Sequence, residues 1–101
     1  MALETTKWDA ADYLNSSEEI AAYLEAALED GDHRVIAHAL GAIARSKGMT
    51  EVAKTAGVTR EALYKALSEK GDPKLSTLLG VIKALGLRLA AVPADEHKTA
   101  A

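Results

Sequence analysis

The stretch EVAKTAGVTREALYKAL, residues 51–67, decides the fold of this chain. It places the small residue Ala53 four positions before Gly57 and follows the glycine with a Thr-Arg-Glu sequence that starts at Thr59. Glycine accepts a left-handed backbone without penalty, so Gly57 can end one short helix in a sharp turn. Thr59 is a preferred N-cap for the next helix. The order alanine, three residues, Gly-Val, four residues and leucine is the helix-turn-helix pattern, whose second helix enters the DNA major groove by its N-terminal end.

The polar side chains around this turn are the candidate DNA contacts. They are Thr50, Thr59, Arg60, Glu61, Tyr64 and Lys65. Arg60 can grip guanine O6 and N7 with two hydrogen bonds, and Glu61 can accept one from cytosine N4–H. Thr50 lies in the first turn of the preceding helix, where free N–H groups favour phosphate. Further phosphate contacts are expected from flanking lysines, namely Lys47, Lys54, Lys70 and Lys74.

Hydrophobic periodicity predicts an all-α protein that ends in one short strand. The expected helices cover about 17–29, 33–46, 50–56, 59–68 and 74–85, and the alternation in 87–92 predicts the strand. Ser16 with Glu19 matches a capping box at the first helix. The expected inward stripes include Val35 in the second helix, Ala62 in the fourth, and Leu75 and Leu79 in the last. A lone strand needs a partner for its backbone, in the same chain or in a second copy.

Composition narrows the classes of function. The 101 residues, 49% of them hydrophobic, suit a single globular domain, and the absence of cysteine excludes disulfides and cysteine zinc sites. No signal sequence and no run of about 18 apolar residues is visible, so we expect a cytoplasmic protein without a membrane partner. His33 and His38 do not share a helix face as a metal pair would, and no catalytic triad or phosphate-binding glycine loop is present. We therefore expect no enzyme activity, no metal and no cofactor.

Charge divides the chain into an acidic and a basic part. Residues 1–32 hold nine acidic residues and one basic residue, whereas residues 33–92 hold ten basic and four acidic ones. The boundaries expected from this pattern are an acidic N-terminal arm and helix (1–32), a helix-turn-helix DNA-binding domain with the strand (33–92), and a disordered tail (93–101). A basic domain suits a nucleic-acid partner although the whole chain has a net charge of −3.

These residues also resemble known families. Residues 33–86 resemble the five-helix DNA-binding domain of the Cro and λ-repressor class, the XRE family, and the acidic helix would be an addition to it. The segments EEIAAYLEAALEDGD, ALGAIARSKGMTEVAKTAGVTREALYKALSEKGDP and LLGVIKALGLRL are similar to addiction-module antidote proteins, HigA-like antitoxins. This likeness covers about residues 8–92.

The resemblance implies a function. Such proteins bind their own operator DNA as homodimers, repress their operon, and neutralise a small basic toxin, an mRNA-cleaving enzyme of the RelE/HigB type. The class places base contacts at residues 59–61, 64 and 65 and a phosphate contact near Thr50, but it often has a phosphate-binding glutamine where this chain has Met49.

Two alternatives stay open, a stand-alone XRE-type regulator without a toxin and a protein-interaction module without DNA binding. The acidic helix has two possible roles, contact with the toxin or packing on the core through Ile20, Leu24 and Leu28. In the second case Trp8 and Tyr13 would anchor the arm.

Overall fold

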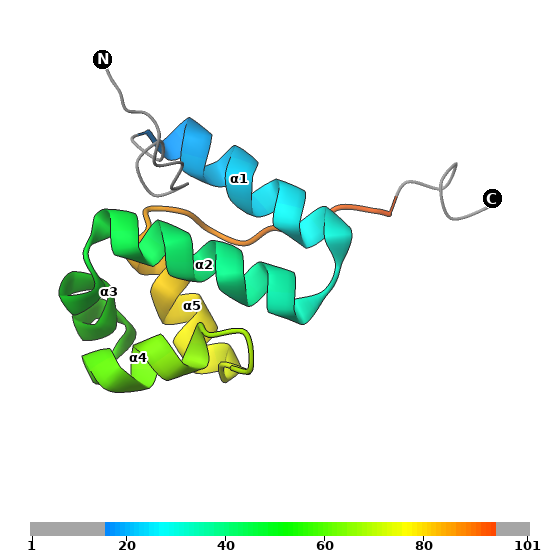
Figure 1. The fold of residues 1–101 in the computed structure, drawn as a ribbon. Coiled ribbons are helices and arrows are strands. Elements are labelled where there is room, and N and C mark those ends of the chain that lie inside the picture. The colour runs from blue at the N-terminus through cyan, green and yellow to red at the C-terminus, as the bar shows by residue number, and fades with distance from the viewer. Residues whose placement is uncertain (1–15, 95–101) are drawn as a thin grey trace, which may run out of the picture.

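The protein is a bundle of five helices in the computed structural model, which describes residues 16–94 (Figure 1). The helices are α1 (Ser17–Asp30), α2 (His33–Lys47), α3 (Met49–Ala56), α4 (Arg60–Ala66) and α5 (Leu75–Ala84). This confirms the all-α prediction and each of the five expected helices to within a few residues. The acidic helix α1 is itself one of the five, so residues 33–92 contain four helices and not the five of the domain they resemble.

Local capping explains where the helices begin. Ser16 Oγ accepts a hydrogen bond from the Glu19 N–H at 3.1 Å, as the capping-box pattern predicts for that pair. The Asp32 carboxylate accepts one from the Arg34 N–H at 2.9 Å and so caps α2. Gly48 is the single residue between α2 and α3, and its N–H closes the last turn of α2 by donating to the Ala44 carbonyl.

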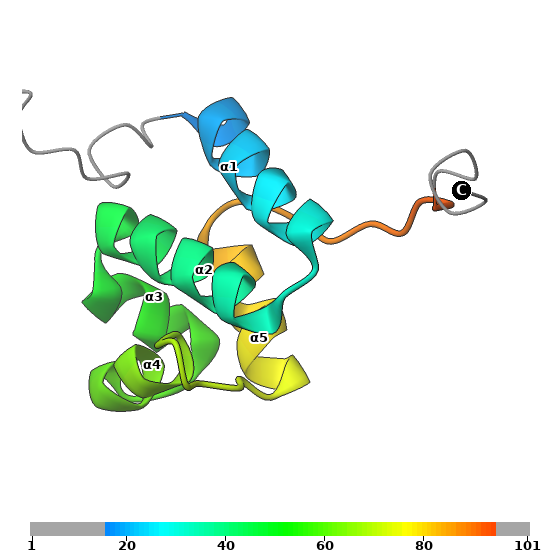
Figure 2. The same cartoon turned by 45° about the vertical axis from the view of Figure 1, so that its right-hand side comes forward.

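Helix α2 lies at the centre of the bundle, with α1 along one side and α3, α4 and α5 on the other (Figures 1 and 2). Its C-terminal half is buried almost all round, since neighbours cover it from both sides. The largest fully buried side chains come from α2, α3, α4 and α5, with the C-cap of α5 included: Leu40, Ile43, Val52, Leu63, Val81 and Leu85. One core therefore holds the helices together, and α1 adds Ile20, Leu24 and Ala27 to it.

Helices α3 and α5 form the most extensive packed pair, and a glycine permits their approach. A Cβ atom on Gly80 would lie 2.7 Å from the Ala56 Cα. This separation is too short for two carbon atoms, so the crossing point needs glycine on one helix and a small residue on the other.

Four residues predicted to face inward are exposed: Val35, Ala62, Leu75 and Leu79. In α5 the buried stripe follows Leu78, Val81, Ile82 and Leu85, and the other two leucines lie along its edge. Leu75 is 68% exposed because it starts the helix beyond the end of the core. Val35 lies in the first turn of α2, where fewer neighbours cover that helix. Ala62 lies in the first turn of α4, outside the stripe that Leu63, Ala66 and Leu67 turn towards the core. The prediction was wrong for these four residues.

The strand predicted for residues 87–92 is absent from the described part of the chain, so that prediction was also wrong. After the Leu87 N–H donates to the Ile82 carbonyl at 3.1 Å, residues 88–92 pass along α1 without a sheet partner, and the chain then leaves the bundle (Figure 1). A strand exists only as part of a pair, and no segment between residues 16 and 94 runs beside this one as a partner.

Trp8 and Tyr13, the proposed anchors of the acidic arm, lie outside the described residues, as do residues 95–101. Within residues 16–94, none of the helices combines the length and the apolar character that crossing a membrane requires.

The cap of α2 carries a testable charge effect. The Arg34 side chain and backbone N–H donate to the Asp32 carboxylate and hold its pKa below the ordinary value, and Nη2 lies 3.0 Å from Oδ2. A lowered folded-state pKa stabilises the fold at pH values above the unfolded pKa of about 3.9, and this contribution is lost as the pH falls through the folded value. We expect Asp32→Ala to lower the melting temperature at pH 7, and the difference from the unmodified chain to shrink towards pH 2. Asp72→Ala, which removes an exposed carboxylate from a loop, is the control.

Candidate nucleic-acid interface

The turn between α3 and α4 has the geometry that the sequence predicts. Gly57 adopts a left-handed conformation, with φ 76° and ψ 27°. The Gly57 N–H donates to the Lys54 carbonyl at 3.2 Å, and the Val58 N–H donates to the Ala53 carbonyl at 3.0 Å. These bonds satisfy the last carbonyls of α3 and reverse the chain within two residues. Ala53 is buried at this corner, and Val58 packs against the core.

Helix α4 is held by its apolar side. Leu63 is fully buried, at 0% exposure, and Leu67 just after the helix is buried too. The Thr59 Oγ1 accepts a hydrogen bond from the Ala62 N–H at 3.0 Å, so Thr59 is the N-cap, as predicted. Since its oxygen already serves the cap, Thr59 is better suited to donate its O–H to a phosphate than to accept from a base.

All six side chains predicted to contact DNA are exposed. Arg60, Glu61, Tyr64 and Lys65 lie on the outer side of α4, and Thr50 lies in the first turn of α3. The Arg60 Cζ atom is 5.6 Å from the centre of the Tyr64 ring, which is within range of a cation–π interaction. In this contact the arginine side chain lies over the outer surface of α4.

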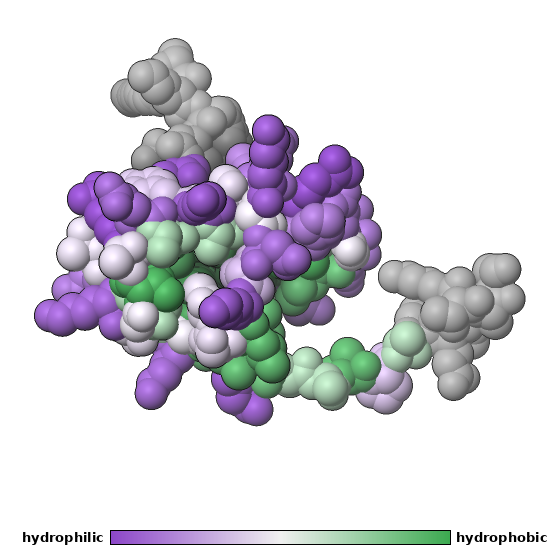
Figure 3. All heavy atoms as spheres, turned by 90° about the horizontal axis from the view of Figure 1, so that it is seen from below, coloured by the Kyte–Doolittle hydropathy of each residue, from purple (hydrophilic) through white to green (hydrophobic). Residues whose placement is uncertain are grey.

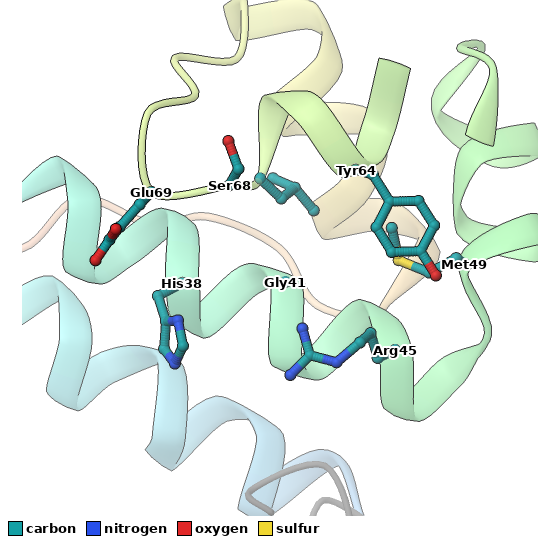
Figure 4. Close-up of a pocket in the computed structure, with 8 residues that line it drawn as sticks. His38, Gly41, Arg45, Met49, Tyr64, Ser68 and Glu69 are labelled. Atoms are coloured by element: carbon teal, nitrogen blue, oxygen red, sulfur yellow. The ribbon is translucent and has the colours of Figure 1, made fainter. Parts of the chain in front are cut away.

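A cleft between α2 and α4 adds residues that the sequence analysis missed. Its volume is about 430 Å³, and its lining includes Arg45 and His38 from α2 together with Tyr64 and the following loop. Figure 4 shows Arg45 and Tyr64 at one end of this cleft and His38 and Glu69 at the other. Arg45 extends the cationic surface of α4 onto the last turn of α2. From the sequence alone, the only sign that Arg45 belongs to this surface is its place beside Lys47 in the basic last turn of α2.

Met49 is buried at 6% exposure and belongs to the core. It lies in α3 directly before Thr50, at the position where the resembled class often has a phosphate-binding glutamine. A buried thioether offers phosphate no hydrogen-bond donor. Any phosphate contact at this end of α3 therefore depends on Thr50 and on the backbone N–H groups of its first turn.

Charge around the turn is mixed but predominantly basic. The four flanking lysines, Lys47, Lys54, Lys70 and Lys74, are all exposed. No group of three or more His, Asp or Glu side chains that could hold a metal ion occurs within residues 16–94. The surface thus offers cations, an aromatic ring and hydroxyl groups, which are the groups that bind phosphates and base edges.

A second polar surface lies on α1, far from the turn in the fold (Figure 1). Glu18, Glu25 and Glu29 are exposed and recur at intervals of seven and four, which places them on one face of the helix. Ile20 and Leu24 are buried on the opposite face. We call the three glutamates the acidic ridge. Packing through Ile20 and Leu24 is thus confirmed, while Leu28 remains 46% exposed beside the ridge.

Comparison with known proteins matches almost the whole chain. A family model described as "Probable addiction module antidote protein" matches residues 4–93. A relative from Haemophilus influenzae, described as an uncharacterized protein, is 43% identical over 88 residues, covering 87% of this chain and 91% of the relative. No solved structure matches the chain.

Proposed function

Because the chain belongs to the family of probable addiction module antidote proteins, we propose that it is the antitoxin of a type II toxin–antitoxin module. In this proposal it binds operator DNA through α4, represses its own operon and neutralises a RelE/HigB-like mRNA-cleaving toxin. It acts by binding and catalyses no reaction.

The observation that carries the DNA-binding part is the orientation of α4. Buried Leu63 fixes the helix to the core, and the turn at Gly57 leaves its first two turns exposed with a polar and cationic surface. Arg60 and Tyr64 would read base edges, while Thr50, Lys54 and Arg45 would contact phosphates. Because α4 has only seven residues, its whole outer face can fit within one segment of the groove.

Operator binding of this kind uses two copies of the chain. One seven-residue helix reads only a few base pairs, and a two-fold symmetric dimer doubles the site. The two half-sites would lie about 34–36 Å apart, one turn of the DNA helix. A repressor that covers its own promoter in this way prevents transcription of the operon.

The acidic ridge is the surface we propose for the toxin. An enzyme that cleaves mRNA needs positive charge to hold its substrate, and Glu18, Glu25 and Glu29 present complementary charge on one face. Such complementarity accelerates encounter and favours the correct partner. Helices α1 and α4 lie on opposite sides of α2 (Figure 1), so one chain can engage both partners.

One experiment tests the proposal and its two alternatives. The full chain is mixed with the DNA upstream of its own reading frame and, separately, with the product of the adjacent reading frame. We expect binding to both, with DNA affinity falling steeply as salt rises because phosphate contacts release counterions. DNA binding without a protein partner supports the stand-alone regulator, and a protein partner without DNA binding supports the interaction module.

The ridge has its own test. We expect Glu18→Lys, Glu25→Lys and Glu29→Lys combined to weaken binding of the neighbouring gene product at low salt, while operator binding stays at the level of the unmodified chain. The matched control reverses three exposed acids elsewhere, Asp72, Glu51 and Glu69. Equal loss of toxin binding in both triple variants would contradict a specific role for the ridge.

A further inference from the structure

The Arg60 guanidinium contacts an aromatic ring and not a carboxylate. Its Cζ atom lies 5.6 Å from the centre of the Tyr64 ring. The two residues are four positions apart on α4, the spacing that brings side chains together on one face of a helix. Within residues 16–94, no carboxylate forms an ion pair with Arg60, although Glu61 adjoins it in the sequence. In the described chain, the ring is therefore the contact that limits where this guanidinium can go.

The Tyr64 ring is itself supported by the fold. Leu63 and Leu67, on either side of it in the sequence, are both buried and fix this part of the chain to the core. Tyr64 is 45% exposed, and its ring lines the cleft between α2 and α4 together with the buried Met49. Figure 4 shows the ring beside Met49 at one end of this cleft. Because a tyrosine side chain has only two χ angles, a half-covered ring offers a stable platform to a longer side chain.

An arginine without such a platform has two competing ligands on DNA. A guanidinium binds phosphate oxygens as well as the O6 and N7 atoms of guanine. Figure 3 views the bundle from below, the side on which α4 lies in Figure 1, and hydrophilic side chains project from that side into solvent. Since phosphates border the groove, a freely rotating arginine on this side could pair with either ligand. A phosphate contact carries no sequence information, whereas a bidentate guanine contact specifies a base.

We propose that Tyr64 is a positioning residue that directs Arg60 to a base edge and away from phosphate. A cation–π contact uses none of the N–H donors of the guanidinium, so all five stay available for a base. Tyr64 thus contributes to base reading through Arg60. The inference rests on the proposed function, because it concerns how one contact of that DNA-binding surface becomes specific.

A second arginine is placed to take the phosphate instead. Arg45 comes from α2 and lines the same end of the cleft as Tyr64 (Figure 4). Its Nη1 atom lies close to Gly41, where an added Cβ atom would be 3.7 Å away. The two guanidinium groups therefore belong to different helices, and each can meet a different part of the DNA groove.

Substitution of the ring tests the proposal through the specificity ratio. This ratio is the affinity for the upstream DNA divided by the affinity for a shuffled DNA of the same composition, at fixed salt. An exposed cation–π contact corresponds to a factor of about 2 to 5. We expect Tyr64→Leu to lower the ratio by about that factor, with binding to the shuffled DNA unchanged or tighter. Tyr64→Phe, which restores the ring without the hydroxyl, should restore the ratio.

A double-mutant cycle distinguishes positioning from a base contact made by Tyr64 itself. If the ring acts through Arg60, Tyr64→Leu should have no further effect on the ratio in a chain that already carries Arg60→Ala. If the tyrosine reads a base on its own, the two losses should add. Far-ultraviolet circular dichroism of each variant should match the parent, since Tyr64 lies outside the buried core.

NMR of the chain without DNA measures the contact directly. Protons above an aromatic ring are shifted upfield, so the δ-methylene protons of Arg60 should be shifted in the parent and in Tyr64→Phe. The same protons should return to the position of a solvated arginine in Tyr64→Leu.

Three results would each overturn the positioning role: an unchanged ratio in Tyr64→Leu, an equal loss in Tyr64→Phe, or full additivity with Arg60→Ala. Specific binding of the upstream DNA by the parent would leave the proposed function intact in all three cases. A parent chain that binds upstream and shuffled DNA equally would contradict the operator role itself, and with it any directing role of Tyr64.

Discussion

Leu63→Ala is expected to lower the free energy of unfolding by about 2–5 kcal/mol, the range for leucines truncated in a closed core. Leu63 is fully buried in the core cluster and is the only buried residue within α4. Its removal leaves a cavity where α4 meets the rest of the bundle. Since a domain of this size has only about 5–15 kcal/mol of total stability, a large fraction is lost. Urea unfolding followed by circular dichroism measures the change.

The same chemical change at Leu75 is the matched control. Leu75 begins α5 and is 68% exposed, so Leu75→Ala should change the free energy of unfolding by no more than about 0.5 kcal/mol. If the two variants were equally stable, α4 would not depend on the core in the way the structure shows.

Arg60→Ala is expected to weaken operator binding by about 1–3 kcal/mol, or roughly 5- to 150-fold, without unfolding the domain. The side chain is exposed on the first turn of α4 and lies over Tyr64, where it can reach a guanine edge. Loss of a bidentate contact should also relax sequence preference at one base pair, whereas loss of a phosphate contact would weaken all sequences alike. Titration of labelled operator at fixed salt measures the affinity.

Arg34→Ala is the control for this variant. It removes a guanidinium group from the first turn of α2, where Arg34 pairs with Asp32. The operator affinity of this variant should fall only by the small amount expected from losing one surface charge far from α4. Unchanged affinity in Arg60→Ala, or equal losses in both arginine variants, would contradict base reading by α4 and favour the interaction module.

The sequence predicted the local features of the turn because they depend on adjacent residues. Gly57, Val58 and Thr59 each act through their own backbone or through a partner within five positions, and all three are where the pattern placed them. Leu63 was predicted to be buried for a similar reason, since it continues the apolar side of one helix. Exposure of the six candidate contact residues follows from the same helical period.

Features that depend on distant segments were harder to predict. Leu79 and Leu75 belong to an apolar stripe, but which edge of that stripe faces the core depends on where α3 crosses α5 at Gly80. Arg45 joins the α4 surface only because α2 passes beside α4 and a cleft separates them. The alternation in residues 87–92 indicates a strand, but no partner for it lies in the described part of this chain, so the pattern could not show the observed unpaired state.

The most direct test of the account is to map the operator-bound surface by NMR. The uniformly ¹⁵N-labelled chain is titrated with the DNA upstream of its reading frame, and backbone amide shifts are followed residue by residue. The account predicts the largest changes at residues 57–65, with smaller ones at Arg45 and the first turn of α3, and little change along the acidic ridge. Changes confined to α1 or to residues 87–92, with α4 unaffected at saturating DNA, would contradict it.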